Sequence, residues 1–355
     1  MEFLPTRVTR SSAGKAGNEN MPLSNAIDSH PSKITVKRPG LALRPRNGTK
    51  QLKLNEDTTL PKQVSRLQTA RDYFDKHWHQ DVYEAVDYQD DINKYLASIE
   101  GNFVVDETFI IDKKVTAKMR SILVDWLVQV HQRFHLLPET LHLSVFILDR
   151  FIEQEEVVKQ ELQLLGTGAL FISCKYEEIY MPECSEFEFI SDGAFTKKEL
   201  IRMENRILKS LGCQLSRPQS LHFLRFLTTS LEAEVEIHSM SKYFLEICLL
   251  DAPMSAVRPS VLAMACCWLS LRLHRKPDHE KRLPSLLGFM GGEGSQTLAA
   301  LVTAGHRVAR AILRIQSLSK LKAVDEKYDS SRHHHASRLS TQQQAMLSAI
   351  AGSSS

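Results

Sequence analysis

The stretch MRSILVDWLVQVHQRF at residues 119–134 carries more apolar residues than one buried face of a helix requires. These residues form two stripes at helical spacing: Leu123, Leu127, Val130 and Phe134 in the first, and Met119, Ile122 and Trp126 in the second. A helix that packs on one side needs only one stripe. The second stripe is therefore either core or an exposed docking patch, and periodicity alone favours core because extra apolar positions are usually buried.

The chain on both sides of this stretch repeats the helical pattern, and strand-like alternation is nearly absent. The pattern predicts a leading helix over 83–99, followed by two blocks of helices. The first block covers 115–134, 139–152, 162–180, 187–190 and 196–211, and the second covers about 219–230, 235–251, 259–273, 283–290 and 295–316. The predicted fold class is all-α, with two consecutive five-helix domains of similar length.

Local signals mark two of these helices. The helix over 162–180 contains the small residues Gly166, Gly168, Ala169 and Ser173. Small side chains let neighbouring helices come close, so we expect this helix to be central and surrounded. Thr196 and Glu199 form a capping box that opens the next long helix, and Gly212 ends it.

The predicted organisation has five parts. They are a disordered arm (1–70), a leading helix and linker (71–114), a first domain (115–215), a second domain (216–330) and a polar tail (331–355). Residues 1–60 hold ten Lys or Arg against five acidic residues and one aromatic residue, which is too little apolar surface to offset chain entropy. We expect His333, His334 and His335 to be solvated in the tail rather than to bind metal, because no second ligand cluster is apparent.

Composition argues against several classes of protein. The net charge of +3 does not suggest binding to nucleic acid or to a membrane, and no apolar run predicts a signal peptide or a membrane-spanning helix. The six cysteines form no CxxC pair and lie in apolar segments, which predicts reduced, buried thiols in an intracellular protein.

The sequence also lacks a catalytic constellation. No HExxH, GxSxG or kinase catalytic-loop pattern occurs, and the GGEG at 291–294 lacks the lysine of a phosphate-binding loop. The adjacent acidic pairs at 155–156 and 177–178 point to different helix faces, so they are not a paired general acid and base. We therefore predict no enzyme activity, no catalytic residue, no cofactor and no metal site.

Two charged residues, Lys175 and Glu204, lie on helices whose other faces are apolar. Such residues on a helix surface are usually solvated and contribute little to stability. A specific contact to a partner is the alternative.

Five motifs together resemble the cyclin box of mitotic cyclins, and the last resembles B-type rather than A-type members. They are MRSILVDWLVQVHQRF (119–134), ETLHLSVFILDRF (139–151), KYEEIYMPE (175–183), TKKELIRMENRIL (196–208) and SRPQSLHFLRF (216–226). The resemblance covers about residues 80–330. It implies a regulatory subunit of two five-helix domains that has no activity of its own. It also implies binding to a cyclin-dependent protein kinase, in a one-to-one complex that is active at the G2/M transition.

The resemblance implies three surfaces. The kinase contact would comprise Lys175, Glu204, Tyr176, Glu177, Glu178, Ile179 and Tyr180, with Tyr88, Ile92 and Tyr95 on the leading helix. A docking patch for substrates and inhibitors of Arg-x-Leu type would comprise Met119, Ile122, Leu123, Trp126, Gln129, Leu162 and Gln163. A phosphate-binding pocket of B-type members would comprise Arg225, His238 and Lys242, although the last two could equally form a solvated helix face.

The arm is expected to contain a destruction box, the peptide that the anaphase ubiquitin ligase recognises before proteolysis. Its best candidate runs from Arg38 to Leu41, which supplies Arg-x-x-Leu in a segment predicted to be accessible. The family also implies a cytoplasmic and nuclear location that changes with the cell cycle. The alternatives are an A-type cyclin acting in S/G2 and a general transcription factor that shares the fold. The latter would need a zinc ribbon, and the chain has no cysteine before Cys174.

Overall fold

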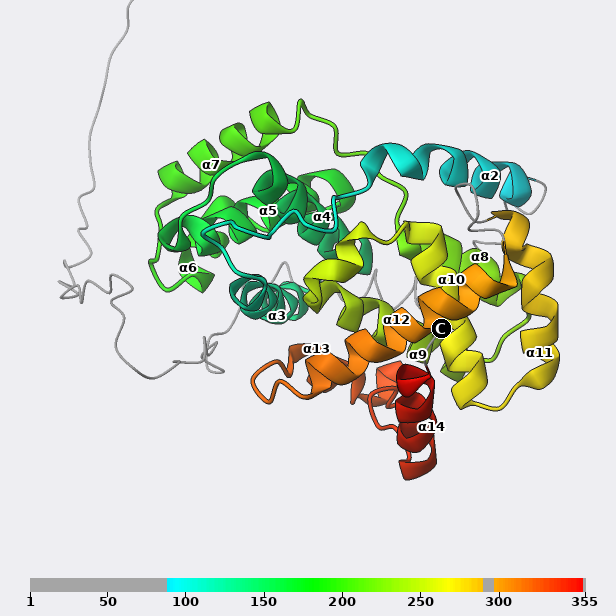
Figure 1. Cartoon of the computed structure of the whole chain (residues 1–355). Coiled ribbons are helices and arrows are strands. Elements are labelled where there is room, and N and C mark those ends of the chain that lie inside the picture. Colours follow the sequence, from blue (N-terminus) through cyan, green and yellow to red (C-terminus); the bar gives the residue numbers. More distant parts are fainter. Residues whose placement is uncertain (1–87, 290–296, 354–355) are drawn as a thin grey trace, which may run out of the picture. The chain divides into compact units, whose positions relative to one another are not determined.

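The structure is a computed structural model that describes residues 88–289 and 297–353 (Figure 1). Within these ranges the chain forms helices and connections and no strand, which confirms the predicted all-α fold class. A leading helix, α2, spans Gln89–Ile99 and continues into a 3-10 turn, η2, over Glu100–Phe103.

Two groups of helices follow the leading helix. The first domain contains α3 (Ala117–Arg133), α4 (Pro138–Gln154), α5 (Leu162–Glu177), α6 (Cys184–Ile190) and α7 (Lys197–Ser210), with the turn η3 (Lys159–Glu161) before α5. The second contains α8 (Ser220–Ser230), α9 (Val235–Leu250), α10 (Pro259–Leu273), α11 (Pro277–Arg282) and α12 (Leu298–Gln316), with the turns η4 (Ala252–Ala256) and η5 (Leu283–Phe289). Two consecutive helical domains are thus confirmed.

Each domain is built around one buried helix. In the first, α5 contacts α3, α4 and α7. A Cβ atom added to Gly166 would lie 2.9 Å from the side chain of Leu123, and one added to Gly168 would lie 3.0 Å from Met203 Cγ. The small residues therefore permit close helix contact, as predicted. In the second domain, α10 contacts α8, α9 and α12, which lies against it in Figure 1.

Several helix ends form where local chemistry predicted them. The Thr196 hydroxyl accepts a hydrogen bond from the backbone N–H of Glu199 at 3.3 Å, and Glu199 Oε2 accepts one from Thr196 N at 2.7 Å. This capping box opens α7. Gly212 follows the helix with a φ of 56°, a conformation that glycine adopts without steric cost.

The chain after Tyr328 differs from the expected polar tail. Helix α13 spans Ala323–Tyr328 and ends just before this segment. The segment itself contains the turn η6 over Ser331–His333 and a further helix, α14, over Thr341–Gly352. Helix α14 contacts α12, and its Leu347 is fully buried. The pattern missed α14 because one buried side chain in twelve residues produces almost no periodicity.

Two further expectations about side chains were wrong in part. His333 is half-buried against the ring of Tyr328, with 4.5 Å between ring centroids, and burial lowers its pKa to about 4. It is therefore not solvated, whereas His334 and His335 are exposed. All six cysteines are free thiols, but Cys213 is exposed and Cys184 is half-buried. The prediction of buried thiols holds for the other four.

Candidate functional site

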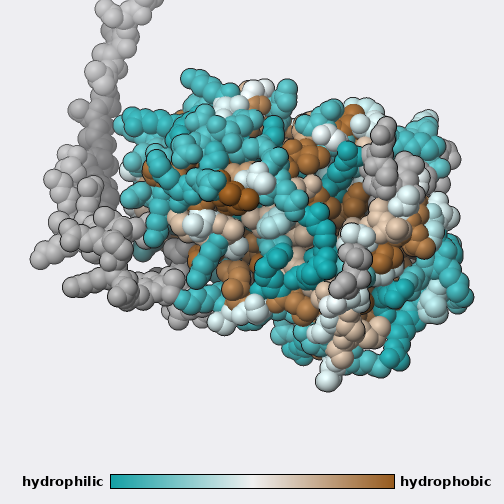
Figure 2. All heavy atoms as spheres, in the orientation of Figure 1, coloured by the Kyte–Doolittle hydropathy of each residue, from teal (hydrophilic) through white to brown (hydrophobic). Residues whose placement is uncertain are grey.

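A group of exposed apolar side chains lies at the carboxyl end of α5. Tyr176, Ile179 and Tyr180 are 51%, 79% and 66% exposed, and Met181 is 36% exposed. The face drawn in Figure 2 is mostly hydrophilic and carries several separate hydrophobic patches. Contiguous apolar side chains at a surface are a frequent mark of a protein–protein interaction site.

An ion pair lies beside these apolar residues. Lys175 Nζ donates a hydrogen bond to Glu204 Oε1 at 2.5 Å, which joins α5 to α7. The lysine ammonium also lies 4.3 Å from the ring centroid of Phe171. The side chains of Lys175 and Glu204 are 42% and 12% exposed, so a partner would meet a preformed pair at this end of the two helices.

The two acidic residues between the lysine and the exposed isoleucine are engaged within the chain. Glu178 Oε1 accepts hydrogen bonds from Leu137 N and Thr140 Oγ1, both at 2.6 Å. It thereby caps the amino end of α4, where Leu137 supplies no side-chain cap of its own. Both acids were predicted as partner contacts, yet Glu178 acts here as a structural cap.

Glu177 has a similar structural role. Its Oε1 accepts a hydrogen bond from Gln219 Nε2 at 2.8 Å, and burial raises the pKa of the carboxyl group. Gln219 immediately precedes α8, so this bond attaches the end of α5 to the second domain. Together with the Glu178 cap, it holds Tyr176, Ile179 and Tyr180 in their exposed positions.

The leading helix carries a second set of exposed apolar residues. Tyr88, Ile92 and Tyr95 are 67%, 46% and 62% exposed and share one face at helical spacing. Glu100, which is fully buried, fastens the end of this helix to the second domain. Its carboxylate accepts hydrogen bonds from Ser260 N at 2.9 Å and Ser260 Oγ at 2.6 Å, at the amino end of α10.

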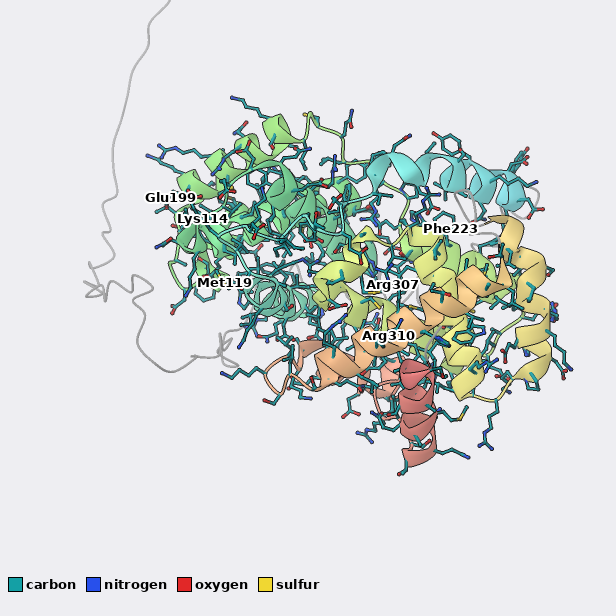
Figure 3. The ribbon with its side chains drawn as sticks, viewed as in Figure 1. Lys114, Met119, Glu199, Phe223, Arg307 and Arg310 are labelled. Carbon is teal, nitrogen blue, oxygen red and sulfur yellow. The ribbon has the colours of Figure 1, made fainter. Side chains whose placement is uncertain are left out.

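Three of the seven residues of the predicted docking patch are core. Leu123, Trp126 and Leu162 are only 4%, 3% and 7% exposed, so within the second stripe the core position favoured by periodicity holds for Trp126. The remaining members are half-buried: Met119, Ile122, Gln129 and Gln163. Figure 3 labels Met119 on α3, the helix that carries both stripes. A peptide at this place would meet these half-buried side chains, with Trp126 and its buried neighbours beneath them.

The three residues of the predicted phosphate pocket already have partners. Arg225 forms an ion pair with Glu139 of α4. Burial raises the pKa of that carboxyl, but the charge and hydrogen bond of Arg225, a backbone hydrogen bond and the charge of His222 together lower it to about 2. The Thr228 hydroxyl contacts both the carbonyl oxygen of Arg225 at 3.3 Å and His238 Nδ1 at 3.0 Å, which brings the two residues together. Lys242 is one turn beyond His238 on α9, and a phosphate here would compete with Glu139 for Arg225.

Other predicted features lie outside this region. Arg38 and Leu41 lie outside the residues that the structure describes. Across residues 88–289 and 297–353, His, Cys, Asp and Glu form no group of three that could hold a metal ion. No helix in that part of the chain is long and apolar enough to cross a membrane.

The chain resembles known proteins in sequence and in fold. Residues 91–216 match the family described as "Cyclin, N-terminal domain", and residues 218–342 match "Cyclin, C-terminal domain". It is 38% identical over 263 residues to G2/mitotic-specific cyclin-B1 of Caenorhabditis elegans, covering 71% of this chain and 72% of that protein. It is 35% identical over 268 residues to G2/mitotic-specific cyclin-B of Spisula solidissima, covering 76% of this chain and 61% of that protein. It thus spans less than two thirds of the length of several relatives that it matches.

A solved structure shares the fold. A viral cyclin from herpesvirus saimiri matches with a TM-score of 0.52 at 19% sequence identity, covering 66% of this chain and 99% of that one. At that identity the likeness concerns the arrangement of helices alone.

Proposed function

Because the chain belongs to the cyclin family, among its G2/mitotic-specific B-type members, we propose that it is the regulatory subunit of a mitotic cyclin-dependent protein kinase. The observation that carries this proposal is the preformed Lys175–Glu204 ion pair beside the exposed Tyr176, Ile179 and Tyr180. The backbone of a docked helix would hydrogen-bond to the pair, with its carbonyl oxygens accepting from Lys175 and its amides donating to Glu204. The docked helix would also bury the exposed apolar side chains. Full burial of one such side chain contributes about 1.5–3 kcal/mol.

The activating effect would follow from preferential binding. A protein kinase positions ATP through a lysine that pairs with a glutamate on a mobile helix of its small lobe. A subunit that binds this helix only in the competent position shifts the kinase toward its active state, without any catalytic group of its own. The Glu178 cap and the Glu177–Gln219 bond support this role, because a rigid surface selects one helix position better than a flexible one.

Reconstitution with a mitotic kinase subunit tests the proposal. The full chain should raise histone phosphorylation by the kinase by orders of magnitude and show no kinase activity alone. The variant Lys175→Ala leaves the Glu204 charge unpaired in the interface and should lose about 2–5 kcal/mol of binding free energy, which is at least about 30-fold in Kd. The variant Lys175→Ala/Glu204→Ala, which removes both contacts, should also lose activation. Unchanged activation by that variant would reject the assignment of the contact.

A matched control is available on the same chain. Lys276 and Glu234 form another Lys–Glu pair, with side chains 35% and 46% exposed, in the second domain. The variant Lys276→Ala/Glu234→Ala removes the same charges and should leave both binding and activation unchanged.

We propose that the mitotic role extends to substrate choice and timed removal. The half-buried Met119, Ile122, Gln129 and Gln163 are the side chains that an Arg-x-Leu peptide would contact. The destruction box at Arg38 and Leu41, recognition by the anaphase ubiquitin ligase, and movement between cytoplasm and nucleus belong to the same proposal. Deleting residues 38–47 should stabilise the protein at mitotic exit, and unchanged turnover would reject that box.

A further inference from the structure

A small cavity lies where the two domains meet. Its volume is about 40 Å³. Its walls come from α4 of the first domain and, in the second, from Arg217, the start of α8, the end of α9, η4 and Leu262 of α10. Six polar side chains line it: His142, Asp149, Arg217, Gln219, Ser220 and Ser255. The other seven lining residues are apolar. Because a dry cavity is normally apolar throughout, the hydrogen bonding of the polar atoms decides whether this one holds water.

Two buried polar atoms in this lining have no partner among the described residues. They are His142 Nε2 and Gln219 Oε1, on side chains only 8% and 4% exposed. Gln219 Nε2 donates to Glu177 Oε1 at 2.8 Å, which identifies the other amide atom as the oxygen that lacks a donor. Buried polar atoms in folded proteins are nearly always hydrogen-bonded, so both need a partner that the chain does not supply.

The charges around the cavity define the chemistry of that partner. Burial lowers the pKa of His142 to about 4, so its ring is neutral near pH 7. The guanidinium of Arg217 lies over the ring of Phe146, 4.5 Å from the centroid, and is positively charged. The Asp149 carboxylate accepts bonds from Arg120 at 2.6 and 2.7 Å and from Ser255 Oγ at 2.7 Å. Gln219 Oε1 is an acceptor and needs a donor, which a halide ion cannot supply, whereas water can both donate to Gln219 and bond to a neutral imidazole.

We propose that this cavity is a binding site for ordered water, which bridges His142 of the first domain to Gln219 at the start of the second. A single water needs a cavity of at least about 10–15 Å³, so there is room for more than one. Pockets for organic ligands are about 300–1,000 Å³, which excludes them here. Gln219 also donates the hydrogen bond to Glu177, so the water would also support the position of the exposed end of α5.

Crystallography of the complex of the full chain with its kinase tests the proposal directly. We expect density at about 2.7–3.2 Å from both His142 Nε2 and Gln219 Oε1. A crystal grown with bromide should show no anomalous signal in the cavity. Either an empty cavity or a bromide peak would overturn the proposal.

Solution measurements with variants supply a second test. His142→Phe places an apolar ring at the cavity, and oxygen-17 relaxation dispersion should then detect at least one fewer long-lived water than in the natural chain. Leu148→Met is the control, because Leu148 is a buried residue of α4 that does not line the cavity. Its count of long-lived waters should not change. An equal count for His142→Phe and the natural chain would contradict the proposal, and if that variant does not fold, the crystal structure decides.

Discussion

Asp125 is a buried carboxylate on α3 whose main partner lies 198 residues later in the sequence. Its Oδ1 accepts a hydrogen bond from Ala323 N at 3.0 Å, and so caps the start of α13. Burial raises the pKa of this group from 3.8 to about 6, against the lowering effect of the hydrogen bonds from Ala323 and Gln129. A residue of the first domain thus caps the amino end of α13, a helix that follows α12 of the second domain.

Replacing Asp125 by asparagine should change how stability depends on pH. The folded state holds a proton on Asp125 that the unfolded state releases, so this group lowers stability as pH rises from about 4 to about 6 and has a constant effect above that. The raised pKa corresponds to roughly 3 kcal/mol. Asp125→Asn retains the acceptor for Ala323 N. Urea unfolding should therefore show the variant gaining up to roughly 3 kcal/mol over the natural chain between pH 4 and pH 7.

The opposite result would identify a different role for this carboxylate. If the two proteins differed by the same amount at both pH values, Asp125 would titrate normally and its burial would carry no electrostatic cost. Glu139 and Glu246, whose pKa values are lowered to about 2, act in the opposite direction in both proteins and cancel in the comparison.

Among the elements, α10 and α12 approach each other closely at one glycine. Gly305 of α12 lies against Trp268 of α10, and an added Cβ atom would be 2.3 Å from the Cε3 and Cζ3 atoms of the indole. Trp268 is 2% exposed, so its ring has little space to move. Glycine is needed at this position for close approach rather than for an unusual backbone conformation.

Gly305→Ala should therefore destabilise the second domain even though alanine favours helices. Overpacking of a core typically costs about 1–3 kcal/mol, and a rigid indole places this site at the upper end. Gly288→Ala is the matched control, because an added Cβ atom there meets nothing within 4 Å. Thermal unfolding should show a clear loss of Tm for Gly305→Ala and little change for Gly288→Ala. Equal values would indicate that α12 can shift away from α10.

For the whole molecule, one arginine joins elements of both domains. Arg120 of α3 is fully buried and pairs with Asp149 of α4 through two nitrogens. Its remaining donors reach Leu249 O at 2.8 Å and Ser255 Oγ at 3.1 Å in the second domain. Arg307 of α12, labelled in Figure 3, adds a more exposed link to Glu107 of the linker at 2.8 Å.

Removing the buried arginine should weaken the junction strongly. Arg120→Leu leaves Asp149 as an uncompensated buried charge, which costs about 3–5 kcal/mol. The double variant Arg120→Leu/Asp149→Asn removes that charge and should recover part of the loss. Arg307→Leu, at the exposed link, should cost at most about 1 kcal/mol. Urea unfolding of the three variants would contradict this account if Arg120→Leu were no worse than Arg307→Leu.

Much of the fold followed from local signals. The capping box of Thr196 and Glu199, the stop at Gly212 and the small residues of α5 each depend on neighbours in sequence, and each was found where predicted. The helix over 259–273 has the predicted bounds, because Pro259 begins it and its apolar run is continuous. The candidate surface was predictable only through resemblance, since an exposed tyrosine and a buried one look alike in sequence.

The helices, their grouping into two domains and the family could all be predicted from the sequence, because they depend on periodicity and on motifs of neighbouring residues. The roles of the charged residues became visible only in the folded chain. Glu178 caps α4, Asp125 caps α13, and Lys175 pairs with Glu204 rather than with solvent. The reason is physical: a carboxylate's role is set by which donors lie within about 3 Å, and those donors come from distant parts of the chain.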